Sequence, residues 1–327
     1  MPPSPPLLTA RLLRLAPRQV LGCALVLVLL ASGGAYAWHA WSQANAATLR
    51  QEQLRLHRVM DQDTPLGYRQ VVQRGQALLK GGADDDGILQ MVTYAATILA
   101  IEHQDTDMLA LARRLLAPQG QQEPLAGLEG QEGYLTAARI LMLYGDGDLT
   151  EGLALAESVS GLETGFVMAR LEGLRLMVAA KVETPKVTVV AQELGASVGT
   201  EVRALAYLGL WQLALGNTAQ AEQYFSRVLA QSPAHPQALL GLQWVRLSAL
   251  HPAPEDLWRA HKQAGDALRL PAAALTPPIA ATALLLRALA SELEGDAPKA
   301  ERDRAEALQL DPGNLLHEIN RDGPARP

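Results

Sequence analysis

Two stretches of the chain carry the same pattern of small and helix-ending residues. The segment LALGNTAQAEQYFSRVLAQSP covers residues 213–233, and LEGDAPKAERDRAEALQLDP covers residues 293–312. The matched pairs, each 79 residues apart, are Gly216 and Gly295, Ala221 and Ala300, and Pro233 and Pro312. A glycine, an alanine and a proline restated at one spacing predict an array of repeated units, because self-similarity at a fixed period is typical of repeat architectures.

The first copy predicts an antiparallel helical hairpin of about 34 residues. Gly216 suits the position just past a helix end, where only glycine takes left-handed dihedrals cheaply. Asn217 or Thr218 can cap the second helix. Ala221 is small where the two helices approach, Phe225 lies one turn further along the same face, and a proline ends the unit. Such a hairpin cannot bury its apolar faces alone, so we expect neighbours to stack on it.

These residues resemble the tetratricopeptide repeat family. The positions that carry the resemblance are Leu208, Gly209, Gly216, Ala221, Phe225 and Pro233. The chain departs from the family pattern with Leu205 where the family prefers Trp, with Gln212 where it prefers Tyr, and with Val228 where a small residue is more typical. The resemblance implies an all-α fold, a right-handed α-solenoid of helical hairpins.

The second copy keeps the small and helix-ending residues but has polar residues on one face. It retains Ala288, Gly295, Ala300, Ala307 and Pro312. Arg287, Ser291 and Arg304 replace apolar positions, which is typical of a terminal repeat whose outer face meets water. Between the copies, residues 236–268 predict a middle hairpin and the proline-rich residues 269–278 predict a loop.

Upstream, apolar residues continue on helical spacing with glycine or proline breaks. We expect hairpins over 87–118, 134–161 and 164–194, and a single packing helix over 67–80. Only KVTVV, residues 186–190, looks strand-like. The repeat region is therefore expected to span residues 66–315, with a tail over 316–327.

The N-terminal residues predict a membrane anchor. Residues 1–18 are basic, with three arginines, and residues 20–37 contain no charge, so 19–38 is expected to form one transmembrane helix. Aromatic residues at 36, 38 and 41 favour the membrane interface. The alternative is a signal peptide cleaved after Ala37, because residues 35–37 read A-x-A. The arginines place the rest of the chain, beginning with a helical stalk over 39–65, outside the cytoplasm, in the periplasm of a bacterial envelope.

Charge and cysteine content exclude several classes of function. The net charge is −6, and three of the basic residues lie within residues 1–18, whereas the first acidic residue is Glu52, so the body of the chain is acidic. We therefore expect no nucleic-acid partner, because phosphates require basic patches. The single cysteine, Cys23, excludes an intramolecular disulfide framework. Its VLGC context resembles a lipoprotein box, but the apolar stretch follows the cysteine, so we expect a bystander thiol.

We expect no catalytic centre, metal site, cofactor or small-molecule substrate. GASVG, residues 195–199, matches the G-x-S-x-G nucleophile motif, but that motif needs a strand before the serine and a helix after it. Here a helical pattern precedes Ser197, so we interpret the segment as an interhelical loop, with Gly195 ending one helix and Thr200 capping the next. A serine hydrolase using Ser197 is the less favoured alternative. The seven histidines are scattered, and the short acidic turns lack calcium-loop spacing.

The resemblance implies that the first helix of each hairpin lines a concave channel that holds partner peptides or helices. The positions carried over are Ala206, Leu210, Leu213, Leu240, Trp244, Leu247, Leu285, Leu289 and Leu293. Their apolar character favours an amphipathic helix or apolar segment of a protein partner, and predicts a membrane-anchored scaffold for envelope assembly or quality control. In the alternative, a self-associating structural solenoid fills the channel itself, with AAALTPP or with the tail after Asn314.

Overall fold

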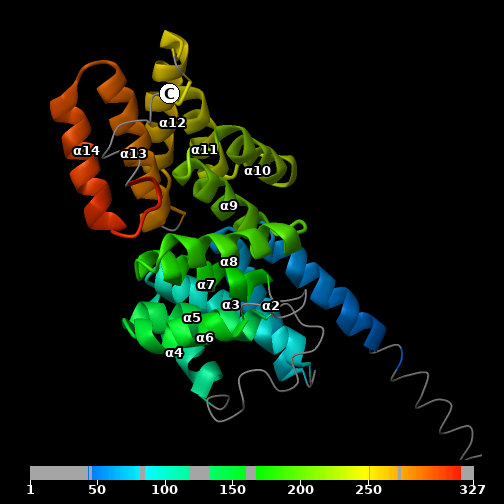
Figure 1. Ribbon diagram of the computed structural model, residues 1–327. Helices are drawn as coiled ribbons and strands as arrows, with labels where there is room; N and C mark the ends of the chain where they lie inside the picture. The colour runs from blue at the N-terminus through cyan, green and yellow to red at the C-terminus, as the bar shows by residue number, and fades with distance from the viewer. Residues whose placement is uncertain are drawn as a thin grey trace, which may run out of the picture. The chain divides into compact units, whose positions relative to one another are not determined.

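A computed structural model describes residues 43, 46–81, 85–117, 133–159, 167–249, 251–271 and 274–317 (Figure 1). The chain divides into two compact units, residues 1–54 and 55–327, and all elements named below lie in the second. The described residues form helices and no strand, so the predicted all-α class is confirmed. Residues 186–190, which look strand-like in sequence, are helical because they belong to a longer helix.

The predicted N-terminal features lie outside the described residues. These are the basic segment 1–18, the anchor 19–38 with Cys23, and the A-x-A pattern at 35–37. Within the described ranges, no helix combines the length and apolar character needed to cross a membrane. Of the predicted stalk, residues 46–60 are helical.

The helices follow the expected hairpins closely. Their bounds are α2 (Pro65–Lys80), α3 (Asp86–Glu102), α4 (Thr106–Leu116), α5 (Tyr134–Asp146), α6 (Leu149–Val159), α7 (Val167–Ala179), α8 (Thr184–Ser197), α9 (Val202–Ala214), α10 (Thr218–Gln231), α11 (Pro236–Leu247), α12 (Pro254–Leu268), α13 (Pro277–Leu293) and α14 (Ala297–Leu310).

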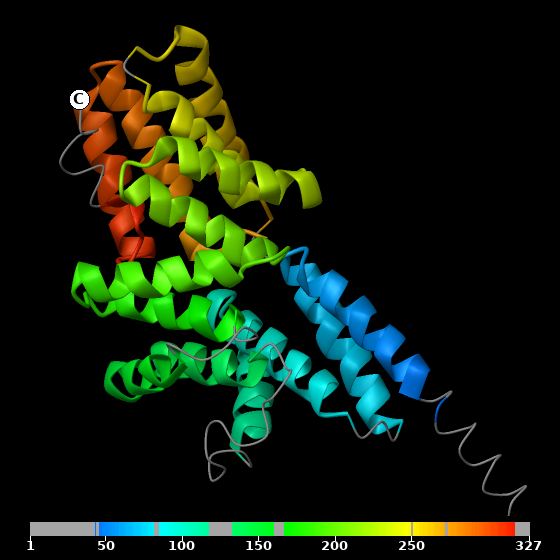
Figure 2. The same ribbon diagram turned by 45° about the vertical axis from the view of Figure 1, so that its right-hand side comes forward.

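Successive hairpins pack in the order of the sequence (Figures 1 and 2). We call α3, α5, α7, α9, α11 and α13 the first helices and α4, α6, α8, α10, α12 and α14 the second helices. Each first helix contacts the next first helix, and each second helix packs on its own first helix. From α6 to α12, each second helix also contacts the first helix of the following hairpin. The single helix α2 packs on α3.

Glycine turns end three of the first helices in the same way. Gly216 has φ of +77°, and its N–H donates to the Leu213 carbonyl at 2.9 Å while the following N–H donates to the Gln212 carbonyl at 2.8 Å. This pair of bonds is the Schellman motif, which satisfies carbonyls that a helix end leaves free. Equivalent bonds close the turns at Gly147 and Gly295. The predicted role of the two repeated glycines is confirmed.

The expected helix caps are only partly correct. Asn217 is the N-cap of α10, but its side chain makes no capping bond and instead donates to the Gln212 side chain at 2.9 Å. At α9 the N-cap is Glu201, not Thr200. Gly195 does not end a helix, because α8 continues to Ser197.

Small residues let the helices approach, as the repeat pattern predicts. The alanines that are buried on the second helices include Ala112, Ala156, Ala221, Ala260, Ala264, Ala300 and Ala307. Phe225 of α10 is fully buried, and its ring packs against Gly209 of α9 and Gly241 of α11. One aromatic ring thus joins two hairpins through the space that two glycines leave open.

Candidate functional site

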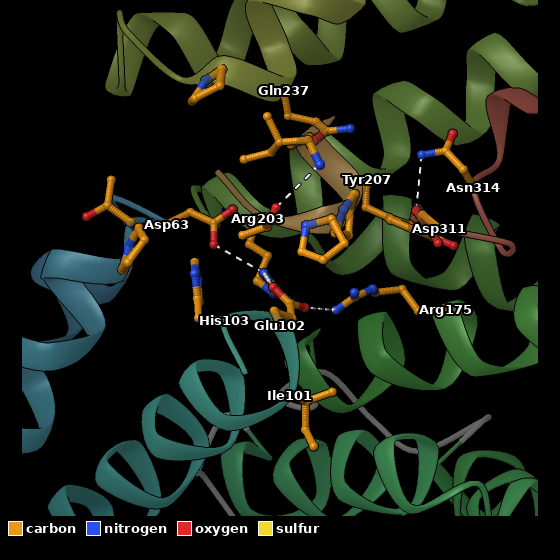
Figure 3. A pocket seen from close by; sticks show the side chains of 18 of the residues that line it. Asp63, Ile101, Glu102, His103, Arg175, Arg203, Tyr207, Gln237, Asp311 and Asn314 are labelled. Atoms are coloured by element: carbon orange, nitrogen blue, oxygen red, sulfur yellow. Dashed lines mark hydrogen bonds and ion pairs between the residues drawn. The ribbon is translucent and has the colours of Figure 1, made fainter. Parts of the chain in front are cut away.

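The first helices converge on one cavity of about 850 Å³ (Figure 3). All six of them contribute wall residues, whereas the second helices contribute only Leu310, at the end of α14. The rest of the wall comes from residues 63–69, from residues 103–104 and 234–235, from the loop before α13, and from residues 311–315. A volume of this size is typical of ligand sites. Of the two segments that the self-filled alternative places in the channel, the described residues Ala274, Thr276, Pro277, Pro278 and Leu315 line the wall, and residues 272–273 and 318–327 lie outside the described residues.

Arg203 of α9 forms the centre of the polar side of the cavity. Its guanidinium pairs with Asp63 at 3.3 Å, with Glu172 at 3.2 Å, and also with Glu102. All three of its nitrogens bond to carboxylates. The side chain is only 12% exposed, so these partners offset the cost of removing the charge from water.

Arg175 of α7 is the second guanidinium of this ion-pair network. Its Nη1 donates to Glu102 at 2.6 Å and to Glu172 at 2.7 Å. Glu172 also accepts a hydrogen bond from the buried Tyr94 hydroxyl at 2.6 Å. The network, defined by Asp63, Glu102, Glu172, Arg175 and Arg203, therefore joins the loop before α2 to α3, α7 and α9.

Asp63 connects this network to α11. His235, the N-cap of α11, accepts the Ala238 N–H at its Nδ1, 3.3 Å away. The ring proton therefore lies on Nε2, which donates to the Asp63 carboxylate at 3.3 Å and leaves the imidazole neutral. The Tyr68 hydroxyl donates to the other oxygen of Asp63. Asp63 has φ of +47°, an uncommon conformation that these contacts hold in place.

The arginines determine the ionisation of the network carboxylates. Burial alone would raise the pKa of Glu102, but the charges of Arg203 and Arg175 lower it to about 2. Burial likewise opposes ionisation of Asp63, yet Arg203 and the hydrogen bond from His235 hold its pKa well below the ordinary value. Both groups are therefore carboxylates at neutral pH.

A different environment surrounds Asp311, at the other end of the cavity (Figure 3). Its carboxylate accepts a hydrogen bond from the Asn314 side chain at 3.1 Å. Asn314 also donates to Thr282, which Gln237 contacts in turn, so the C-terminal segment is fixed to α11 and α13. Burial raises the pKa of Asp311. Within the described ranges, no arginine, lysine or histidine lies within ion-pair distance of it.

Two tyrosines lie near Asp311 with unused hydroxyls. Tyr144 and Tyr207 both line the cavity, and burial raises the pKa of each, opposed by the Arg175 charge and assisted by the Asp311 charge. Neither hydroxyl has a hydrogen-bond partner among the described residues. Hydroxyls that donate and accept but have no protein partner are available to a ligand or water.

Most of the predicted channel residues are buried within the helix stack. Ala206 and Leu210 do line the cavity. Of the other predicted positions, Leu293 is half-buried. The remaining six side chains are 3% exposed or less: Leu213, Leu240, Trp244, Leu247, Leu285 and Leu289. These side chains contact the chain's own helices, so a partner could reach them only if the hairpins separated.

The charged network was not predicted, although the sequence carries a signal for it. Glu172 and Arg175 lie within the mostly apolar α7, and Glu102 and Arg203 lie at the end of α3 and the start of α9, which are also mostly apolar. A charge in such a helix is buried and needs an opposite charge. Glu172 and Arg175 pair at i, i+3 within α7, but the sequence does not indicate their pairing with Glu102 and Arg203, because these lie on other hairpins.

The serine of the G-x-S-x-G motif lies at the end of a helix. Ser197 is the last residue of α8, and its hydroxyl donates back to the Glu193 carbonyl at 2.9 Å. The strand that a nucleophile elbow requires does not precede it. No group of three or more potential metal ligands occurs in the part of the chain that the structure describes.

Comparisons with known proteins give no match: no family of known proteins, no curated protein and no solved structure is significantly similar to this chain.

Proposed function

We propose that this protein is a helical-repeat adaptor that holds a peptide segment of a partner protein in the cavity between Asp63 and Asp311. The observation that carries the proposal is that all six first helices line this one cavity. A surface built from equivalent helices of successive repeats is what a solenoid presents to its partner. Apolar walls with a few fixed polar groups are typical of binding sites.

The tetratricopeptide assignment and a right-handed α-solenoid are part of this proposal. The sequential packing of hairpins supports them, as do the glycine turns and the packing of Phe225 on Gly209. Four charged groups of the cavity, Glu102, Glu172, Arg175 and Arg203, lie on first helices, where that family places its partner.

The cellular setting is proposed from the sequence alone. Residues 19–38 anchor the chain in the inner membrane, and the repeat region faces the periplasm, where it serves envelope assembly or quality control. Alkaline phosphatase fused after Pro327 tests the orientation. We expect an active, membrane-bound fusion, and an inactive one would place the cavity in the cytoplasm.

Site-specific photo-crosslinking tests the binding site. Benzoylphenylalanine replaces Tyr207, which lines the cavity, and in a matched control replaces Val189, which is exposed on α8. The full-length chain is produced in cells and irradiated, and the crosslinked peptides are sequenced. We expect defined partner peptides at position 207 only. Adducts at position 189 and none at 207 would contradict the proposal.

A structural solenoid without a bound partner is the second candidate, because the predicted channel residues Trp244 and Leu247 are buried. The two candidates predict different results for a variant that fills the cavity. Enlarging Ala206 to phenylalanine would fill open space, and if the solenoid is only structural, the crosslinking at position 207 would be the same with and without this change. The change would abolish crosslinking at position 207 if the cavity binds a peptide.

A further inference from the structure

The charges that line the cavity do not balance. Arg69 pairs with Asp105 at 2.9 Å, so the charges of these two side chains cancel. The remaining lining groups include four carboxylates, Asp63, Glu102, Glu172 and Asp311, but only the guanidiniums of Arg175 and Arg203.

The two lining histidines do not supply the missing positive charge. The hydrogen-bonding pattern of His235 makes it neutral, and burial lowers the pKa of His103. The cavity therefore carries an excess of negative charge in a partly dehydrated space, where charges act strongly.

Both guanidiniums are already paired with carboxylates of the chain. Every nitrogen of Arg203 already bonds to a carboxylate, and Arg175 bridges Glu102 and Glu172. A ligand carboxylate would share these guanidiniums with the chain's own carboxylates and would meet the surplus negative charge. The lining thus disfavours an acidic group.

Asp311 is the carboxylate without a cation. An ionised carboxylate has about four acceptor positions, and the Asn314 side chain and the Gly313 N–H use two of those of Asp311, while the Arg175 charge acts on it from beyond ion-pair distance. The hydroxyls of Tyr144 and Tyr207, which have no hydrogen-bond partner among the described residues, belong to side chains on which the Asp311 charge acts. A tyrosine ring face also attracts a cation. Apolar wall residues, Leu310, Pro312 and Leu315, come from the chain on either side of Asp311.

We infer that the site at Asp311, Tyr144 and Tyr207 receives the ammonium or guanidinium group of a lysine or arginine side chain carried by an apolar peptide segment. The inference rests on the proposed function, because it names the chemistry that the peptide site selects. The cation supplies the opposite charge that Asp311 lacks, and the hydroxyls accept its remaining N–H groups. The apolar neighbours in the peptide contact the apolar wall.

A peptide library measures this preference. Acetylated, amidated pentapeptides carry lysine, arginine, norleucine or glutamate at the centre and alanine, leucine, valine or phenylalanine elsewhere. They are incubated with the full-length chain, and the retained peptides are counted by mass spectrometry. We expect lysine and arginine peptides to be retained about tenfold more than norleucine peptides, and glutamate peptides to be retained least.

Three variants assign the preference to the site. Asp311→Asn should reduce the tenfold preference to threefold or less, by removing the charge while keeping the shape. Tyr207→Phe should weaken retention of lysine peptides a few-fold without changing the melting temperature, because its hydroxyl bonds to no described residue. Glu301→Gln, on the exposed face of α14, removes the same charge elsewhere and should leave the preference intact.

The outcomes separate the inference from the function on which it rests. Retention of all peptides without regard to the central residue would overturn the cation site but keep the peptide-binding function. A lysine preference that persists in Asp311→Asn would overturn the assignment to this residue. Retention of no peptide would overturn both proposals. Competition by lysine amide alone, as strong as by the pentapeptides, would assign the site to a free amine and overturn the peptide ligand.

Discussion

Replacing Gly241 by alanine should loosen the contact between two hairpins. A methyl group at this position would lie 2.2 Å from the Phe225 ring, and one at Gly209 would lie 2.5 Å from the same ring. The ring is fully buried and held between α9 and α11, so it cannot move away from one helix without approaching the other. The chain can accommodate the new methyl only by separating helices.

The expected destabilisation follows from two opposing effects. Overpacking a core costs about 1–3 kcal/mol, whereas glycine to alanine within a helix gains about 0.5–1 kcal/mol. We therefore expect Gly241→Ala to lower the free energy of unfolding by about 1–2 kcal/mol. The matched control is Gly265→Ala in α12, where the nearest outside atom would be 3.8 Å away on Arg269. That variant should gain stability.

Urea unfolding of the full-length chain, followed by tryptophan fluorescence, to which the buried Trp211 and Trp244 contribute, measures both variants. Combining Gly241→Ala with Phe225→Leu should cost less than the sum of the single changes by about 1 kcal/mol, because the smaller side chain leaves room for the methyl. Equal stability of Gly241→Ala and Gly265→Ala would refute the packing argument.

Three further changes test the ion-pair network and the buried channel residues. Arg203→Met leaves three carboxylates without their shared partner and should lower the free energy of unfolding by about 3–5 kcal/mol. The control Arg259→Met, at an exposed position, should change it by less than about 1 kcal/mol. Similar losses in the two variants would contradict a central role for Arg203. Because the pKa of Glu102 is lowered in the folded chain, its ionisation stabilises the fold by about 3 kcal/mol above about pH 4.5, and this contribution is lost as the pH falls toward about 2. A free energy of unfolding that stays the same between pH 5 and pH 2.5 would contradict this. Trp244→Asp should lower the free energy of unfolding by about 3–5 kcal/mol, seen as a lower melting temperature, because it buries a charge without a partner. Trp258→Asp, at an exposed position, should leave the melting temperature unchanged. An unchanged melting temperature for Trp244→Asp would mean that the Trp244 side chain is accessible.

The hairpins could be predicted because local residues define them. Glycine is the residue that takes the left-handed turn cheaply, so Gly216 and Gly295 indicate where first helices end. Likewise, Phe225 and the small residue four positions before it identify the packing face of α10. These features depend on the sequence within one repeat.

The exposure of the channel residues could not be predicted, because the first helices are apolar on more than one side. A first helix contacts the first helices before and after it as well as second helices. Leu240 and Trp244 therefore fit the helical spacing of a channel stripe and of a buried stripe equally well. Only the stacking of the hairpins decides between the two.

The charged network depends on long-range pairing in the same way. Glu102 and Arg203 lie 101 residues apart and meet because α3 and α9 face one cavity. The sequence indicates that each needs a partner but not which one. Asp311 lies outside a helix, next to the repeat-ending Pro312, so nothing in its local sequence distinguishes it from a solvent-exposed turn.

The most direct test of the central claim is methyl NMR of the full-length chain with labelled isoleucine. Ile101 and Ile279 line the cavity, and Ile88 is fully buried away from it. Titration with the retained peptides, or with the crosslinked partner segment, should shift the Ile101 and Ile279 methyl signals and leave Ile88 unchanged. Binding that shifts neither Ile101 nor Ile279 would show that the cavity is not where the peptide lies.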